Sequence, residues 1–135
     1  MKKQIQVVGA IIQHDEKILC MQRGADKHGN VSYKWEFPGG KIESGETKEQ
    51  ALIRELKEEM DLDITGLQYF CSASHEYENL VVNLHFFKCL AQTENFKLNV
   101  HKAYKWLNIN KLGMLDWADA DLHAVEKLQQ DVGEK

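Results

Sequence analysis

Apolar and polar positions along the chain alternate in patterns that predict strands and helices in turn. Residues 4–12 are predicted to form a strand, in which Val7, Val8, Ala10, Ile11 and Ile12 give a nearly continuous apolar run, typical of a strand covered on both faces. A turn follows at residues 14–16, and the apolar pattern returns as a strand over residues 17–23. Further strands are expected at residues 67–74, 80–91 and 104–107, the first two forming a hairpin around residues 77–79.

Two segments have helical periodicity. The first spans residue 47 to about residue 60, and Thr47 with Gln50 three residues later is a capping box that marks its start. Its apolar side consists of Ala51, Leu52 and Leu56. The second spans residues 119–130, and its expected buried stripe consists of Leu122, Val125 and Leu128. Two helices on a mixed sheet predict an α/β fold, namely an α/β/α sandwich.

Composition narrows the class of protein. A chain of 135 residues predicts one domain over residues 1–135, long enough to bury a real core. The net charge of −4, with no basic cluster, argues against a nucleic-acid-binding surface. No apolar run reaches the length of a membrane span, and the first residues lead directly into a strand pattern, so we expect a cytoplasmic protein without a membrane partner. Cys20, Cys71 and Cys89 lie in apolar runs and are expected to be buried free thiols.

The segment over residues 39–62 carries the candidate chemistry. A glycine pair and a tight loop precede a helix with Glu55, Glu58 and Glu59. Residues three and four apart share one face of a helix, so these carboxylates crowd together and repel one another. A divalent cation removes that conflict, and oxygen ligands at this density suit Mg²⁺, with Mn²⁺ as the other candidate. An isolated E-x-x-E-E run would instead be read as a solvated helix face.

The same segment resembles the Nudix box, written G-x5-E-x7-R-E-U-x-E-E-x-G-U with U an aliphatic residue. The matching positions are Gly40, Glu46, Arg54, Glu55, Leu56, Glu58, Glu59 and Leu62, so the box covers about residues 40–62. Asp61 stands where the family has glycine, which normally ends the helix in a left-handed turn. Asp is among the few residues that tolerate such a backbone, so this departure should cost some stability and leave the metal site intact.

The lead-in K-W-E-F-P-G-G-K-I-E over residues 34–43 is similar to the MutT branch of that family. This resemblance implies the Nudix sandwich fold and Mg²⁺-dependent hydrolysis of nucleoside triphosphates, such as 8-oxo-dGTP, to the monophosphate and pyrophosphate. A similar branch acts on CTP, dCTP and 5-methyl-dCTP, and a nucleotide-binding module with little turnover is a second alternative. The preferred base stays open, and so does the choice between monomer and homodimer.

The resemblance also implies roles for individual residues. Glu55, Glu58 and Glu59 would hold the metal with the Gly39 carbonyl, and Arg54 would pair with a ligand glutamate and fix its rotamer. The expected substrate-binding residues are Arg23, Phe37, Gly40, Lys41 and Asp119. Each of three has a simpler alternative: Arg23 as a surface residue, Phe37 as core packing and Asp119 as a helix cap.

One further departure concerns the general base. Sequences of the MutT branch usually carry a glutamate, often followed by histidine, shortly before the tryptophan of the last strand. Here Val100 falls at that place with His101 beside it, and the nearest upstream glutamate is Glu94. The helix carboxylates could suffice, His101 could substitute, or the enzyme could be slow, and the sequence leaves these alternatives open.

Overall fold

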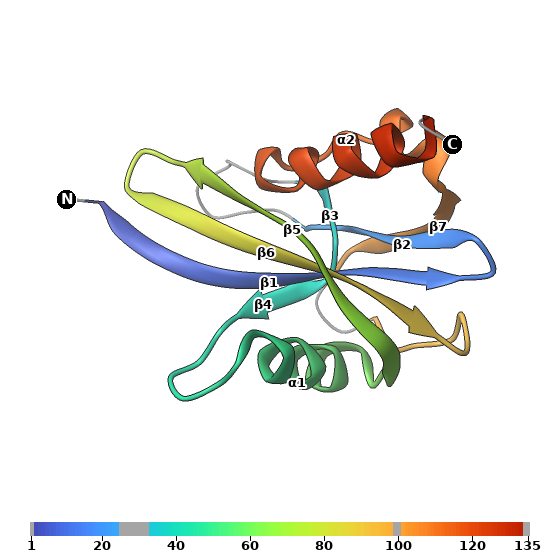
Figure 1. Ribbon diagram of the computed structural model, residues 1–135, viewed down its shortest axis with the longest axis horizontal. Coiled ribbons are helices and arrows are strands. Elements are labelled where there is room, and N and C mark those ends of the chain that lie inside the picture. Colours follow the sequence, from blue (N-terminus) through green and yellow to red (C-terminus); the bar gives the residue numbers. More distant parts are fainter. Residues whose placement is uncertain (1, 25–32, 99–100, 134–135) are drawn as a thin grey trace.

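The computed structural model describes residues 2–24, 33–98 and 101–133 and shows a mixed sheet between two helices (Figure 1). Its strands are β1 (Lys3–His14), β2 (Lys17–Gln22), β3 (Trp35–Glu36), β4 (Gly39–Lys41), β5 (Ile64–Glu76), β6 (Leu80–Ala91) and β7 (Ala103–Asn108). Its helices are α1 (Lys48–Met60), the 3₁₀ helix η1 (Ile109–Met114) and α2 (Asp119–Gly133). The 3₁₀ helix was not expected from the sequence. The polar segment over residues 25–33, whose Gly29 and Asn30 predict a loop, lies mostly outside the described residues.

Strand β1 lies at the centre of the sheet and pairs with β2, β4 and β6. The order of the main path is β3-β2-β1-β6-β5, with β4 paired to β1 and β7 paired to β2. Strands β1 and β6 run parallel, in register from Lys3 opposite Leu80 to Gln13 opposite Leu90, and the other pairs are antiparallel. The expected hairpin of β5 and β6 is present, so the sheet is mixed, as the sequence predicts.

The two helices cover opposite faces of the sheet (Figure 1). Val8, Ala10 and Ile12 of β1 belong to the apolar cluster that also contains Leu52 and Leu56 of α1. Ile11 belongs to the second cluster, which contains Val125 and Leu128 of α2. Successive side chains of a strand point to opposite faces, so β1 contributes to both cores, which explains its continuous apolar run. This arrangement confirms the α/β/α sandwich.

Local hydrogen bonds define both ends of α1. The Gln50 N–H donates to Thr47 Oγ1 at 3.1 Å, and the Thr47 N–H donates to Gln50 Oε1 at 3.0 Å, which confirms the capping box. At the other end Asp61 has φ 51° and ψ 41°, and its N–H donates to the carbonyls of Leu56 and Lys57. The helix therefore ends in the left-handed turn expected for the glycine position of the box.

The buried face of α2 differs from the expected stripe. Val125 and Leu128 are buried as expected, whereas Leu122 is 40% exposed, so the prediction for that residue was wrong. Asp121 is buried instead and lies four and seven residues before Val125 and Leu128, which places the three on one helical face. Leu122 is one residue further round the helix and turns toward solvent.

The three cysteines lie in the interior of the fold. Cys20, Cys71 and Cys89 are buried free thiols, as expected, and burial raises the pKa of Cys20 and of Cys89 to about 12. Across the described ranges, no helix combines the length and apolar character needed to cross a membrane.

Candidate functional site

Gly39 allows β4 to lie close to β1, and Gly40 allows a side chain of α1 to lie close to β4. Gly39 pairs with Gly9 across β4 and β1, and a Cβ on Gly39 would overlap the Val8 carbonyl oxygen. A Cβ on Gly40 would overlap the carboxylate of Glu55. The second glycine therefore leaves a hollow against the strand backbone that the Glu55 carboxylate fills.

Arg54 holds the acidic groups around this hollow. Its Nε and Nη2 donate to the two carboxylate oxygens of Glu46 at 2.7 and 2.9 Å, and the Arg54 hydrogen bond lowers the pKa of Glu46 to about 2. Its Nη1 donates to Glu55 Oε1 at 3.0 Å and to Glu58 Oε2 at 3.3 Å, and Nη2 also donates to the Lys41 carbonyl. The expected pairing of Arg54 with a candidate ligand is therefore present.

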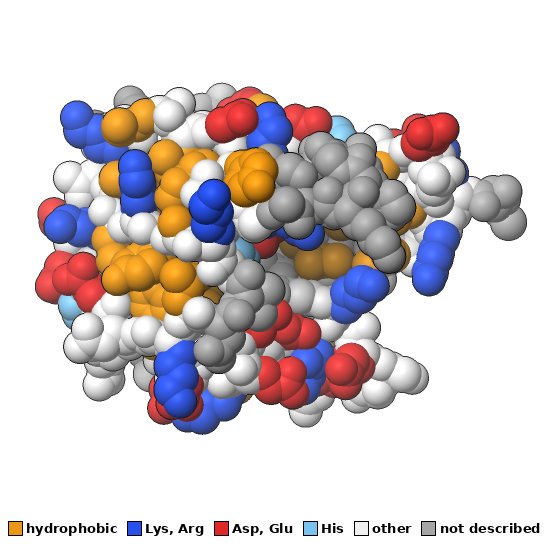
Figure 2. Space-filling view, turned by 180° about the vertical axis from the view of Figure 1, so that it is seen from behind, with side chains coloured by type: hydrophobic (Ala, Val, Ile, Leu, Met, Phe, Trp, Pro, Cys, Tyr) orange, Lys and Arg blue, Asp and Glu red, His pale blue; other side chains and the backbone are white. Residues whose placement is uncertain are grey.

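Glu59 lies in excess negative charge. Burial raises its pKa to about 7, helped by a hydrogen bond and charge from Glu55 and by the charges of Glu36 and Glu58. The candidate metal ligands Glu55, Glu58 and Glu59 all offer carboxylate oxygens, the ligand type that Mg²⁺ and Mn²⁺ prefer, so these residues fit a divalent cation. Figure 2 shows acidic and basic side chains interspersed along the lower side of the molecule, the level at which α1 lies in Figure 1.

Glu36 of β3 is a site residue that the sequence analysis missed. Its Oε2 lies 2.7 Å from Nε2 of His101, and its Oε1 lies 3.4 Å from Nη1 of Arg23. Its charge also contributes to the raised pKa values of Glu59 and Asp121. The sequence did contain a signal, because Glu36 is an acidic residue between two aromatic residues, Trp35 and Phe37, which are both buried.

At the start of α2 the structure separates two aspartates. Asp119 has a side chain that is 68% exposed and lies 3.7 Å from Nε2 of His75, as an ion pair. Asp121 is buried and its Oδ2 accepts a hydrogen bond from the Phe37 N–H at 2.9 Å. Burial, with the charge of Glu36, raises the pKa of Asp121 well above its usual range. Asp121 was detectable as a polar residue on the apolar stripe of α2.

The remaining candidates divide between surface and core. The ring of Phe37 is buried against Trp117, with centroids 4.8 Å apart, and Phe86, at 5.9 Å, which favours core packing over base stacking. The Arg23 side chain is partly exposed at the end of β2, and Lys41 is exposed at the end of β4. Val100, where a glutamate was expected, lies outside the described residues.

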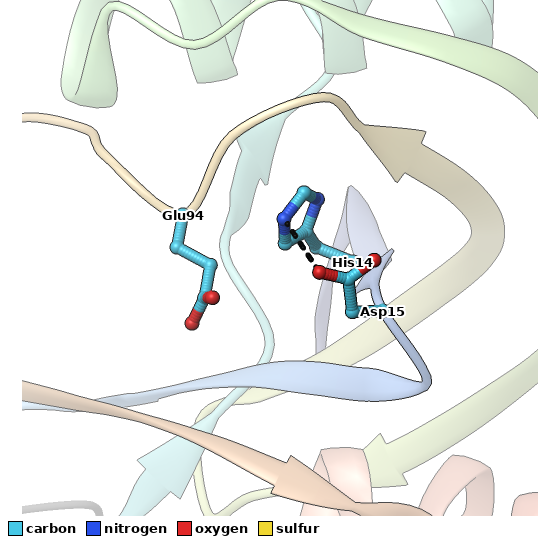
Figure 3. A group of neighbouring side chains, drawn as sticks. All are labelled: His14, Asp15 and Glu94. Atoms are coloured by element: carbon cyan, nitrogen blue, oxygen red, sulfur yellow. Dashed lines mark ion pairs between the residues drawn. The ribbon is translucent and has the colours of Figure 1, made fainter.

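A second group of possible metal ligands lies at the far end of β1. In the part of the chain that the structure describes, His14, Asp15 and Glu94 form one group whose ligand atoms all lie within 4.8 Å of one another (Figure 3). His14 Nδ1 donates to the Ala91 carbonyl at 2.8 Å, and its Nε2 pairs with Asp15 at 3.3 Å. Asp15 and Glu94 are exposed and lie between strands or after them. We therefore interpret the group as a surface contact of His14 with Asp15, with Glu94 nearby.

The sequence matches a known family over most of its length. The family model described as NUDIX domain matches residues 3–128. The chain is 35% identical over 124 residues to a CTP pyrophosphohydrolase of Escherichia coli K12, covering 92% of this chain and 90% of that protein. It is 41% identical over 86 residues to the 8-oxo-dGTP diphosphatase of the same strain, covering 64% and 65%.

Solved structures agree with this match. A solution NMR structure of the DNA mismatch repair protein MutT from methicillin-resistant Staphylococcus aureus 252 is 46% identical, with a TM-score of 0.78, and covers 97% of this chain and 99% of that chain. A crystal structure of a MutT protein from Methanosarcina mazei Go1 has a TM-score of 0.85 over 96% of both chains. At 23% identity this second likeness concerns the fold alone.

Proposed function

We propose, from the premise that this chain belongs to the Nudix family of hydrolases, that it is a Mg²⁺-dependent nucleoside triphosphate pyrophosphohydrolase of the MutT type. Its proposed substrates are modified nucleotides such as 8-oxo-dGTP, which it would hydrolyse to the monophosphate and pyrophosphate. The observation that carries this proposal is the group of Glu55, Glu58 and Glu59 on one face of α1: Arg54 donates to Glu55 and Glu58, and burial beside Glu55 raises the pKa of Glu59 to about 7. Such a group is costly to a fold and useful to a metal-dependent hydrolase.

Each residue has a proposed task. Glu55, Glu58 and Glu59 would hold the divalent cation together with the Gly39 carbonyl, and the bound cation would supply charge neutralisation to the phosphates. Arg54 keeps Glu55 in place, because its guanidinium is itself held by both oxygens of Glu46. Arg23 would grip a phosphate with its planar fork, and a carboxylate poised near neutral pH, as Glu59 is, would take the proton of the attacking water.

A second candidate function is hydrolysis of CTP, dCTP or 5-methyl-dCTP. It is favoured by the likeness to the E. coli CTP pyrophosphohydrolase over 92% of this chain. The exposed carboxylate of Asp119 at the start of α2 also favours it, because a carboxylate only accepts hydrogen bonds and suits the cytosine N4 amino group. A nucleotide-binding module with little turnover is the third candidate.

A panel of nucleotides with Mg²⁺, scored for pyrophosphate against phosphate, tests the proposal. Wild type should release pyrophosphate, and Glu59→Gln should lower kcat by about 10²-fold or more, the scale of a lost base or ligand. Glu49→Gln is a matched control, since Glu49 is exposed in the first turn of the same helix. Near-normal turnover of Glu59→Gln at saturating Mg²⁺ would contradict the proposed site.

The ratio of activities on 8-oxo-dGTP and dCTP tests which aspartate contacts the base. If Asp119 reads the base, Asp119→Asn should change the ratio of kcat/KM values by about tenfold or more, since an amide both donates and accepts. The metal dependence should not change. Asp121→Asn is the comparison variant, because Asp121 is the buried member of the pair. An equal loss on both substrates in Asp119→Asn would assign base selection elsewhere.

A further inference from the structure

Within the described ranges, the buried side chain of His101 makes one short hydrogen bond. Its side chain is 6% exposed, and its Nε2 lies 2.7 Å from Oε2 of Glu36, a residue 65 positions earlier in the chain. An ionised carboxylate only accepts, so the Nε2–H of His101 donates to Glu36. The contact joins the residue that leads into β7 to strand β3, two segments that both pair with β2.

Glu36 has a second and weaker partner. Nη1 of Arg23 lies 3.4 Å from its Oε1, which is near the limit of a hydrogen bond, while the His101 contact is at the short end of the range. The Glu36 side chain is 20% exposed. Among the described residues, His101 is therefore the partner that fixes the rotamer of Glu36, and Arg23 is the weaker second partner.

The position of Glu36 matters to both sides of the site. Glu36 immediately precedes Phe37, whose N–H donates to Oδ2 of Asp121 at the start of α2 at 2.9 Å. After Phe37 the chain continues into β4, where Gly40 lies against the carboxylate of Glu55 on α1. Glu36 thus lies between the proposed metal site and the start of α2, where a freed carboxylate would repel a triphosphate.

We propose that His101 is a positioning residue that acts through Glu36, holding its carboxylate to one rotamer beside the substrate site. The inference rests on the proposed hydrolase function. His101 is then not the general base that its place beside Val100 suggested, because its Nε2 already donates to Glu36 and its ring is buried. The role is one of charge and geometry, and it predicts a change in substrate binding more than in the chemical step.

Two amide variants separate positioning from base catalysis. Gln at position 101 can place an N–H near the position of the histidine Nε2, while Asn is one methylene too short to do so, and neither amide can act as a base at neutral pH. We expect His101→Gln to keep KM within about threefold of wild type, and His101→Asn to raise KM about tenfold or more, with kcat changed less, the scale of one charge-assisted hydrogen bond. A loss of kcat by about 10²-fold in both variants would overturn the proposal in favour of a base.

A double-mutant cycle checks that the effect passes through Glu36. In a Glu36→Gln background, His101→Asn should change KM by less than about twofold, because the charge that His101 holds is gone. Full additivity of the two changes would overturn the proposal. His123→Ala, an exposed histidine on α2, is the control and should leave KM unchanged, and thermal unfolding of every variant reports whether the fold is kept.

The assay of the wild type distinguishes failure of the proposed hydrolase function from failure of the proposed role of His101. An active wild type in which His101→Gln and His101→Asn have equal KM values rejects the positioning role and leaves the hydrolase function standing. A wild type that hydrolyses none of the nucleotides rejects the proposed function, and the role of His101 in substrate binding is rejected with it.

Discussion

Glu59 shows how one side chain can combine a structural cost with a proposed use. It lies half-buried beside Glu55, and the charges of Glu36 and Glu58 add to the repulsion. Arg54 offsets part of this negative charge, but its donors are occupied by Glu46, Glu55, Glu58 and the Lys41 carbonyl, and it makes no hydrogen bond to Glu59 in the described structure. The protein therefore keeps a carboxyl group that prefers a proton or a cation, which is the state expected of a metal ligand before the metal binds.

This environment predicts how pH changes the stability of the metal-free protein. The folded-state pKa of Glu59, about 7, lies above its ordinary value of 4.5, so the folded state favours the neutral carboxyl. Its contribution to the free energy of unfolding is fully present below about pH 4.5 and is lost as the pH rises through about 7. In EDTA, the wild type should therefore lose stability between pH 5 and 8 more steeply than Glu59→Gln, as measured by thermal unfolding. Equal slopes for the two proteins would show that Glu59 ionises normally, and saturating Mg²⁺ should reduce the difference.

At the scale of the element, both ends of α1 are determined by residues that are close together in the sequence. The capping box is formed by Thr47 and Gln50, three residues apart, and could be predicted from the amino-acid sequence alone. Asp61 in the left-handed conformation could also be predicted, because Asp61 stands at the glycine position of the Nudix box. Its carboxylate pairs with Lys57 at 3.2 Å, but both side chains are exposed, so this ion pair adds little.

The left-handed Asp61 predicts a stabilising substitution. Asp61→Gly should raise the free energy of unfolding by about 0.5–1 kcal/mol, because glycine carries no Cβ penalty at positive φ and removes a negative charge from the helix C-terminus. That corresponds to a rise of about 2–5 °C in Tm, measured by calorimetry. Asp61→Ala is the matched comparison and should be destabilised by about 1 kcal/mol. A lower Tm for Asp61→Gly would mean that the Lys57 pair outweighs the backbone strain.

The start of α2 could be predicted less well, for a tertiary reason. The element itself and the burial of Val125 and Leu128 were predicted correctly, whereas Leu122 was wrong because Asp121 occupies the inward position. A buried aspartate is accommodated there because the N–H of Phe37, 84 residues earlier in the chain and just after β3, donates to it. A helical periodicity cannot contain the partner that makes such a residue acceptable.

At the scale of the whole molecule, the sequence predicts the family and the sandwich because both depend on continuous stretches of chain. The box over about residues 40–62 and the two-faced apolar run of β1 are each read without knowing any long-range contact. Contacts between distant residues are the part that it does not predict: the pairing of β7 with β2, and the contact of His101 with Glu36. These depend on which strands become neighbours, and the local pattern does not fix that order.

The parallel pairing of β1 with β6 has a consequence for how the protein is made. The first strand leaves the ribosome long before its central partner, because Lys3 lies opposite Leu80 and Gln13 opposite Leu90. Until then a strand whose centre is apolar, over residues 7–12, has only β2 and the short β4 to pair with. Contacts this distant in sequence are slow to close, and an unpaired apolar edge is where a nascent chain aggregates or engages a chaperone. The vulnerable interval is therefore the time in which α1 and β5 are synthesised, after β1 has emerged and before β6 can pair with it.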